Sequence, residues 1–193
     1  MTEEQVLAEF HAAGALLEGH FILSSGLHSS RYLQCARVLM DPRRASRLAA
    51  ALADRIPHAL RAEIDLVVSP AMGGVVIGHE MGRALGVEAI FVERPQGTFE
   101  LRRGFSLEDG EKVLMVEDVI TTGLSSREAI ETVAAAGGEV IAAAALVDRT
   151  AGSVDLGVPF HALATINFPT YAEDEVPPEL AALPAVKPGS RKK

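Results

Sequence analysis

The sequence predicts an α/β fold built on a doubly wound, mostly parallel sheet. Two observations support this class. Short apolar runs that suit buried strands alternate along the chain with segments of helical periodicity. Loops of small residues follow several of these runs, and glycines close the helical segments. Since parallel strands need crossover connections, the alternation indicates right-handed strand–helix–strand units, although it leaves the order of the strands open.

The first part of the chain, about residues 1–40, has a different pattern. Apolar residues at helical spacing predict a helix over residues 3–13. Residues 20–39 are rich in β-forming residues with partial alternation, and this pattern is broken at residues 24–26. We therefore expect a short helix followed by a hairpin-like segment.

The strand–helix units of the core are predicted over about residues 41–170. Asp41 is a suitable N-cap, and Pro42 is a suitable first helical residue. Gly86 can end the second helix of the core, since glycine readily adopts the left-handed conformation found there. The first elements in order are a helix over 42–60, a strand over 65–69, a tight loop over 70–74, a helix over 75–85 and a strand over 88–93.

Residues 94–111 lie between two predicted strands and show no clear helical or strand period. Long segments of this kind in compact domains are usually lids or binding loops. The segment carries Arg94, Arg102 and Arg103, so it could close over an anionic group and exclude water. We expect a mobile lid, with a solvated hairpin that carries basic residues as the alternative.

The rest of the core repeats the strand–helix pattern, with a strand over 113–117, a helix from about 125 to 136 and a strand over 140–147. Ser125 and Glu128 fit a capping box at the start of that helix, and Gly137 stops it. The proline-rich tail, residues 171–193, is expected to wrap the surface, with its last residues mobile. The whole chain, 1–193, is then a single domain.

Composition bounds the class of function. The chain has 193 residues, of which 48% are hydrophobic, and this suits one sizeable core. No apolar run approaches the roughly 20 residues that cross a bilayer, and the first residues lack the pattern of a secretory signal. A net charge of −8 argues against broad nucleic-acid binding. Because Cys35 is the only cysteine, we expect a cytoplasmic protein without disulfides and a packed Cys35 thiol.

The most informative segment is residues 113–125, with the sequence VLMVEDVITTGLS. A buried strand runs into two adjacent acids, Glu117 and Asp118, and a loop of small residues then opens a helix. Carboxylates accept hydrogen bonds from sugar hydroxyls, while backbone N–H groups and hydroxyls at a helix N-terminus bind phosphate. One segment could therefore hold both ends of a ribose phosphate. Neither a G-x-x-x-x-G-K-[ST] nor a G-x-G-x-x-G motif occurs, which disfavours P-loop and dinucleotide folds.

This motif resembles the signature by which type I phosphoribosyltransferases bind phosphoribosyl diphosphate (PRPP). The resemblance implies the fold of that family, with a small N-terminal hood and a mobile lid. It also implies Mg²⁺ as cofactor, held mainly by PRPP oxygens, and a pyrophosphate-binding role for the loop at residues 70–74. The residues implied to bind PRPP are Glu117, Asp118, Val119, Ile120, Thr121, Thr122, Gly123, Leu124, Ser125, Arg94, Gly73 and Gly74.

Two further segments resemble the orotate phosphoribosyltransferases within that family. Residues 21–29 match the hood pattern F-x-L-x-S-G-x-x-S, and residues 147–149 match a V-D-R segment whose arginine meets the orotate carboxylate. The implied reaction transfers ribose 5-phosphate from PRPP to orotate, giving orotidine 5′-monophosphate and pyrophosphate in pyrimidine biosynthesis. The residues implied to bind orotate are Thr121, Arg149, Tyr32, Leu33, Ser25 and Gly26.

The chain departs from the family pattern in its lysines. Ser24 and Gly73 stand where many members have lysine, and the lid lacks the family's K-x-x-K-x-H lysines, which reach a neighbouring subunit. The catalytic candidates are therefore Asp118 and one of two lid arginines, Arg102 or Arg103. The arginine would stabilise the departing pyrophosphate. The resemblance implies a homodimer with two small-molecule substrates and with no nucleic-acid or membrane partner. A purine phosphoribosyltransferase and a non-catalytic sensor of PRPP or nucleotides stay as alternatives.

Overall fold

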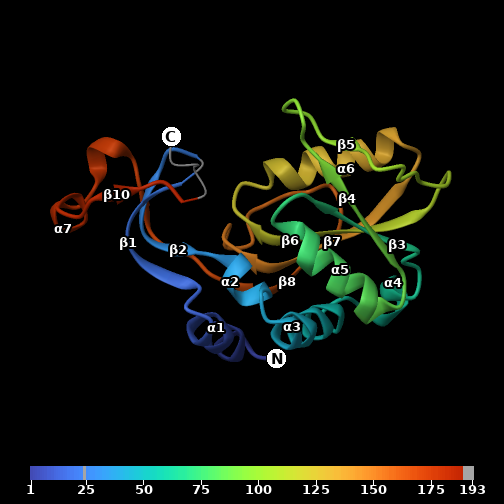
Figure 1. Cartoon of the computed structure of the whole chain (residues 1–193), viewed down its shortest axis with the longest axis horizontal. Coiled ribbons are helices and arrows are strands. Elements are labelled where there is room, and N and C mark those ends of the chain that lie inside the picture. The colour runs from blue at the N-terminus through green and yellow to red at the C-terminus, as the bar shows by residue number, and fades with distance from the viewer. Residues whose placement is uncertain (24, 189–193) are drawn as a thin grey trace.

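The computed structural model describes residues 1–23 and 25–188, which fold around two sheets (Figure 1). Ser24 and residues 189–193, the part of the tail that the sequence predicts to be mobile, lie outside the described residues. The helices are α1 (Glu3–Ala12), α2 (Cys35–Leu39), α3 (Pro42–Ala53), α4 (His58–Arg61), α5 (Gly74–Leu85), α6 (Leu124–Ala135), the 3₁₀ turn η1 (Glu173–Glu175) and α7 (Pro178–Ala181). The strands are β1 (Leu16–Ile22), β2 (His28–Leu33), β3 (Leu66–Pro70), β4 (Glu88–Glu93), β5 (Glu100–Leu101), β6 (Lys112–Ile120), β7 (Glu139–Asp148), β8 (Phe160–Thr165), β9 (Thr170–Tyr171) and β10 (Ala185–Val186).

The core sheet has the order β5-β4-β3-β6-β7-β8, and all neighbouring pairs except β4–β5 are parallel. The predicted mostly parallel sheet is therefore confirmed. From β3 the chain adds β4 on one side and then returns to add β6, β7 and β8 on the other. The boundary between β3 and β6 is thus a topological switch point, the place where open α/β sheets bind ligands beyond their strand ends.

Both faces of the core sheet are covered by helices, because successive strand residues point in opposite directions. Leu114 and Val116 of β6 pack into a cluster with α1, α3 and α5. The alternate residues Val113 and Met115 point the other way and pack into a second cluster with Ala129 of α6. Figure 1 shows α6 on one side of the sheet and α3 and α5 on the other, so the sheet is doubly wound as predicted.

The helix after Asp41 begins as predicted and ends early. The Asp41 carboxylate accepts a hydrogen bond from the backbone N–H of Arg43 at 3.0 Å, and Pro42 is the first helical residue. The prediction that this helix runs to about residue 60 is wrong, since α3 ends at Ala53 and α4 follows as a separate turn. Pro57 explains the break, because proline lacks an N–H group and disfavours a helical conformation in the residue before it.

The hood is a four-stranded sheet with the order β10-β1-β2-β9. The predicted hairpin is present as β1 and β2, although its first strand begins at Leu16 and α2 occupies the last residues assigned to it. The tail supplies β10, which pairs in parallel with β1 along the surface. Helix α1 belongs with the core instead, since Val6 and Phe10 are buried in the cluster beneath the sheet.

Residues 94–111 form a hairpin-like excursion from the edge of the core sheet. Within it, β5 pairs antiparallel with β4, so its geometry is that of the hairpin alternative. Phe99 is buried and Leu107 packs beside it in the same cluster, which anchors the segment. Within the part of the chain that the structure describes, no helix is long and apolar enough to span a membrane.

Candidate active site

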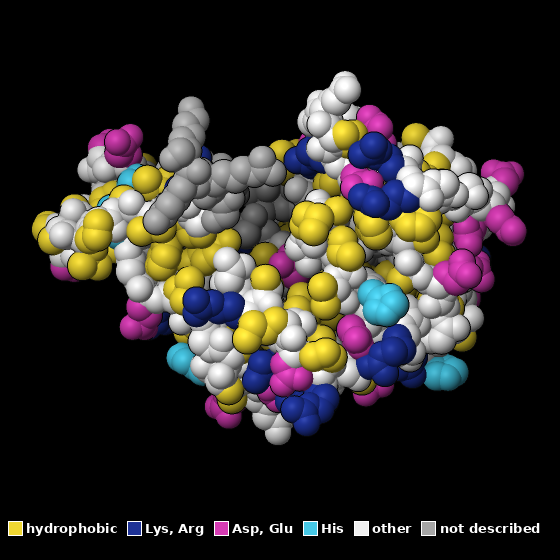
Figure 2. Space-filling view, in the orientation of Figure 1, with side chains coloured by type: hydrophobic (Ala, Val, Ile, Leu, Met, Phe, Trp, Pro, Cys, Tyr) yellow, Lys and Arg dark blue, Asp and Glu magenta, His cyan; other side chains and the backbone are white. Residues whose placement is uncertain are grey.

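A cavity of about 520 Å³ lies at the C-terminal ends of β3, β6 and β7, where the core faces the hood. Figure 2 shows the molecule hollowed between these two parts. The volume is in the range of small-molecule sites, and the position is the one expected for an open α/β sheet. The predicted site residues that line it are Ser25, Tyr32, Leu33, Gly73, Gly74, Arg94, Glu117, Asp118, Val119, Thr121, Thr122, Ser125 and Arg149.

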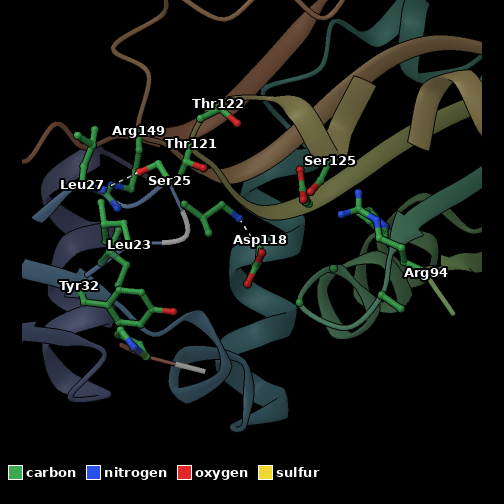
Figure 3. Close-up of a pocket in the computed structure, with 18 of the residues that line it drawn as sticks. Leu23, Ser25, Leu27, Tyr32, Arg94, Asp118, Thr121, Thr122, Ser125 and Arg149 are labelled. Atoms are coloured by element: carbon green, nitrogen blue, oxygen red, sulfur yellow. Dashed lines mark hydrogen bonds between the residues drawn. The ribbon is translucent and has the colours of Figure 1, made fainter. Parts of the chain in front are cut away.

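Strand β6 continues past both acids to Ile120, which corrects the predicted strand end at residue 117. The strand runs to Ile120 because β7 continues beside it, with Val119 opposite Val147 and Ile120 opposite Asp148. Hydrogen bonding to a neighbouring strand therefore holds the backbone of the acidic pair in place. Both carboxylates line the cavity, and Figure 3 shows Asp118 near its centre.

The carboxylates of Glu117 and Asp118 share a desolvated environment. Burial raises the pKa of Glu117 to about 7; the Ser126 hydroxyl opposes this shift, Asp118 adds to it and Arg94 opposes it. Burial also raises the pKa of Asp118, against a hydrogen bond that its Oδ1 accepts from the N–H of Val119 at 2.8 Å. Hydrogen bonds or positive charge supplied by a ligand would favour the ionised form of both carboxyls, so their protonation would be coupled to binding.

The loop that follows the acids enters α6 through Gly123, which has a left-handed φ of 73°. A Cβ here would lie 2.5 Å from Val154 Cγ2, so glycine is required on steric as well as conformational grounds. The predicted capping box is wrong, because the N-cap is Gly123 and Glu128 is paired with Arg94. Thr121, Thr122 and Ser125 line the cavity beside the first turn of α6, where backbone N–H groups lack helical partners.

Three residues predicted to bind PRPP are not among those that line the cavity. Ile120 is 1% exposed and packs in the core beneath the loop. Gly123 is buried and shapes the turn, while the side chain of Leu124 points outward with 55% exposure. Their places show that the motif includes residues that support the loop as well as residues that face the cavity.

Arg149 enters the cavity from the end of β7, on the side of the hood. The turn that carries it is fixed by Asp148, whose Oδ1 accepts hydrogen bonds from the N–H and hydroxyl of Thr150 at 2.6 Å. Burial lowers the pKa of Arg149, and its Nε is buried without a hydrogen-bond partner among the described residues. A buried N–H of a cation is costly when unpaired, so this side chain is suited to receive an anion.

The hood supplies the wall opposite the core. Tyr32 and Leu33 of β2 and Ser25 from the hairpin turn line the cavity (Figure 3). Burial raises the pKa of Tyr32, with Cys35 and Asp118 adding to the shift, so its phenol stays neutral. Gly26 is not a lining residue; its left-handed φ of 84° belongs to the turn itself. A flat ring could lie between this wall and Arg149.

Arg102 and Arg103 are not brought into the cavity. Both lie on the hairpin after β5 and pair with Glu93, with Arg103 Nη2 at 2.8 Å from Glu93 Oε1. Their partner Glu93 ends β4 at the edge of the core sheet, and neither arginine is among the residues that line the cavity. The predicted catalytic role for these two arginines therefore has no support from the arrangement within one subunit.

The sequence reasoning missed three lining residues that come from distant segments: Phe99, Thr170 and Pro188. Phe99 of the lid lies beneath the guanidinium of Arg94, with 4.1 Å between Arg94 Cζ and the ring centroid. Thr170 arrives through β9 and Pro188 through the tail beside β10. No local pattern marks these residues, since the pairing of hood strands brings Thr170 and Pro188 to the cavity and the packing of residues 94–111 on the core sheet brings Phe99.

The described residues contain no group of three or more His, Cys, Asp and Glu side chains that could hold a metal ion. The cavity offers only the adjacent carboxylates of Glu117 and Asp118. Mg²⁺ keeps several waters and is commonly bound through substrate phosphates. The residues present therefore fit an ion that arrives with a phosphorylated ligand and is held mainly by that ligand's oxygens.

Comparisons with known proteins place this site in a family. Residues 36–167 match the model of the phosphoribosyl transferase domain, and the chain belongs to the phosphoribosyltransferase family. An orotate phosphoribosyltransferase of Novosphingobium aromaticivorans is 76% identical over the full length of both chains. Another, of Erythrobacter litoralis, is 70% identical over the full length of both. The crystal structure of orotate phosphoribosyltransferase from Aeropyrum pernix superposes with a TM-score of 0.69 at 29% identity, covering 83% of this chain and 93% of that one.

Proposed function

We propose that the chain is an orotate phosphoribosyltransferase, a pentosyltransferase that converts PRPP and orotate to orotidine 5′-monophosphate and pyrophosphate. Full-length relatives of that name at 70% identity and above support the assignment. The observation that carries it in the structure is the placement of Arg149 across one cavity from Glu117 and Asp118. A carboxylate-bearing base and a ribose phosphate would meet between them.

The donor would lie along β6 and the loop that follows. Glu117 and Asp118 would accept hydrogen bonds from the ribose hydroxyls, and residues 121–125 would bind the 5′-phosphate through hydroxyls and N–H groups. Gly73 and Gly74 would let the backbone approach the pyrophosphate, with Arg94 supplying positive charge. Mg²⁺, held mainly by PRPP oxygens, would supply charge neutralisation on the pyrophosphate.

The acceptor would lie between the hood and Arg149. Tyr32, Leu33 and Ser25 would form one wall, and the guanidinium of Arg149 would form two parallel hydrogen bonds with the orotate carboxylate. Thr121 would contact the ring at the junction of the two subsites. The orotate nitrogen then attacks the anomeric carbon as pyrophosphate departs, so no protein nucleophile is needed. Catalysis rests on positioning and on stabilising charge in a site that excludes water.

The proposed enzyme is a cytoplasmic homodimer. A homodimer would allow the lid of one subunit to reach the cavity of its partner, which is where Arg102 or Arg103 could meet the departing pyrophosphate. A cytoplasmic setting agrees with the buried, free thiol of Cys35. Sedimentation of the purified protein tests the first point, since a monomer with full activity would leave the two arginines without a catalytic role.

The decisive experiment follows the loss of orotate absorbance on addition of PRPP and MgCl₂. Orotate should be consumed with stoichiometric release of pyrophosphate, while adenine and hypoxanthine should leave PRPP unused. Consumption of a purine in place of orotate would favour the purine alternative. Binding of PRPP without consumption of any base would favour a non-catalytic sensor. Either result would overturn the assignment.

A further inference from the structure

Ser126 is a buried polar residue that directly follows residues 113–125 and has no predicted role. It lies in the first turn of α6, one residue after the last predicted phosphate-binding residue, and its exposed fraction is 0%. A buried helical serine usually returns its hydroxyl to a backbone carbonyl of the preceding turn. Here the hydroxyl instead donates to Oε2 of Glu117 across the gap between α6 and β6.

The two acids of the motif are held by different means. Asp118 has a short side chain, and its Oδ1 accepts a hydrogen bond from the adjacent N–H of Val119 at 2.8 Å. Glu117 has one more rotatable bond, and its carboxylate receives the hydroxyl of Ser126 from another element. The orientation of Glu117 therefore depends on how α6 packs against β6, whereas that of Asp118 is set within its own strand.

We propose that Ser126 is a positioning residue for the PRPP site, which holds the Glu117 carboxylate in the orientation that accepts a ribose hydroxyl. The inference rests on the proposed function. The hydroxyl of Ser126 occupies Oε2 and leaves Oε1 of Glu117 for the ligand. A carboxylate fixed in advance loses less conformational freedom on binding than one that must be ordered by the ligand.

The hydrogen bond also bears on the protonation of Glu117. Burial raises the pKa of this carboxyl to about 7, and the charges that face it are Asp118, which raises the pKa, and Arg94, which lowers it. A donated hydrogen bond favours the ionised form. Without the Ser126 hydroxyl, the pKa of Glu117 rises further, and the proton then blocks an acceptor at neutral pH. PRPP binding at pH 7 should therefore release more protons from a variant that lacks the hydroxyl.

The test is Ser126→Ala, measured by calorimetric titration with PRPP and MgCl₂ at several pH values and in buffers of different ionisation enthalpy. We expect PRPP affinity to fall roughly tenfold at pH 7, the effect of losing one hydrogen bond to a charged group. Part of the loss, the part that comes from protonation, should be recovered at pH 9, where Glu117 is ionised in both proteins, and the part that comes from lost orientation should remain. The number of protons released at pH 7 should increase, and Ser126→Thr, which keeps the hydroxyl, should restore affinity.

Two controls separate this role from a general effect on packing. In a Glu117→Ala background, which removes the acceptor, Ser126→Ala should have no further effect on affinity, since it acts through that carboxylate. Ser46→Ala removes a hydroxyl of α3 that accepts a hydrogen bond from Arg83, and it should change neither affinity nor its pH profile. Loss of affinity in Ser126→Ala that is the same at every pH and in both backgrounds would overturn the proposal, as would wild-type affinity at pH 7.

A ligand-free measurement distinguishes failure of this inference from failure of the proposed function. Carbon-13 NMR titration of the Glu117 carboxyl should give a higher pKa in Ser126→Ala than in the wild-type chain. If the wild-type chain neither binds PRPP nor consumes orotate, the proposed function fails, and the inference about the PRPP site fails with it even where the NMR shift is present. If the wild-type chain is active and the Glu117 pKa does not change, only the role of Ser126 is refuted.

Discussion

Substitution of Gly73 by alanine should displace a carboxylate that lines the cavity without disturbing the fold. Gly73 has φ −58° and ψ −42°, a conformation that alanine adopts without strain. A Cβ at this position would lie 2.9 Å from Oδ1 and 3.0 Å from Oδ2 of Asp118. Because the atoms in the way belong to the end of a side chain, the conflict is relieved by movement of the carboxylate, at little cost in stability.

The size of the displacement sets the size of the effect. Ordinary contacts to a Cβ begin near 3.4 Å, so the Asp118 carboxylate must move by roughly 0.5 Å. That movement also strains the hydrogen bond which Asp118 accepts from the N–H of Val119. Since a misplacement of about 1 Å can reduce the rate about a hundredfold, we expect Gly73→Ala to reduce kcat/KM for PRPP roughly tenfold.

Steady-state kinetics and thermal unfolding together test this reasoning, with Gly82→Ala as the matched comparison. At Gly82 on α5, a Cβ would lie 2.8 Å from the Cβ of Ala89 and 2.9 Å from the carbonyl oxygen of Val87, far from the ligand groups. Overpacking there should lower Tm by at least about 2 °C while leaving KM for PRPP unchanged. Gly73→Ala should leave Tm nearly unchanged while it lowers kcat/KM for PRPP. Normal PRPP kinetics in Gly73→Ala, or a matching loss of stability, would refute the argument.

Three other predictions concern the side chains of Arg149, Glu117 and His20. Arg149→Ala should lower kcat/KM for orotate about a hundredfold, and Arg149→Lys should recover only part of it because lysine lacks the planar fork; equal kinetics in both variants would contradict this. Glu117→Gln should raise Tm at pH 8 and not at pH 4, because a folded-state pKa raised from 4.5 to about 7 means that stability is lost as pH rises through this range and stays lost above it; an equal gain at pH 4 would oppose this origin. The imidazole Nδ1 of His20 lies 3.1 Å from the carbonyl oxygen of Leu183, so His20→Ala should speed amide exchange in β10 severalfold, and unchanged exchange would show that the tail is held without it.

The sequence was sufficient where a structural feature depends on neighbours in the chain. The run from the apolar residues of β6 to Ser125 encodes a strand, an acidic pair and a turn that opens α6 within thirteen residues, so its place in the fold could be predicted before its partners were known. Asp41 likewise marked the start of a helix through its side-chain acceptor, and Gly86 marked the end of one through its left-handed backbone. Such signals are local, because the chemistry of capping and of turns acts over a few residues.

The features that escaped prediction depend on pairing between distant segments. Strand β6 runs past Glu117 only because β7 lies beside it, and β8 was not predicted because its residues 160–165 show no strong strand pattern. Thr170 and Pro188 reach the cavity because β9 and β10 join the hood sheet. The Ser126 hydroxyl has a role only in relation to a strand that packs against its helix. Each of these features depends on contacts between segments that are far apart in the sequence, so no short stretch of sequence predicts it.

The order of charges across the cavity explains how a protein with a negative net charge can bind anionic ligands. Arg94 and Arg149 lie on opposite sides of Asp118 in Figure 3, so the centre of the cavity is negative and its two ends are positive. A ligand pair with a hydroxylated sugar in the middle, a pyrophosphate at one end and a carboxylate at the other matches this pattern. Uniform positive charge would attract any anion equally, whereas alternation favours ligands with this spacing. Selectivity would then arise from the arrangement of few charges, while the net charge of −8 is spread over the rest of the molecule.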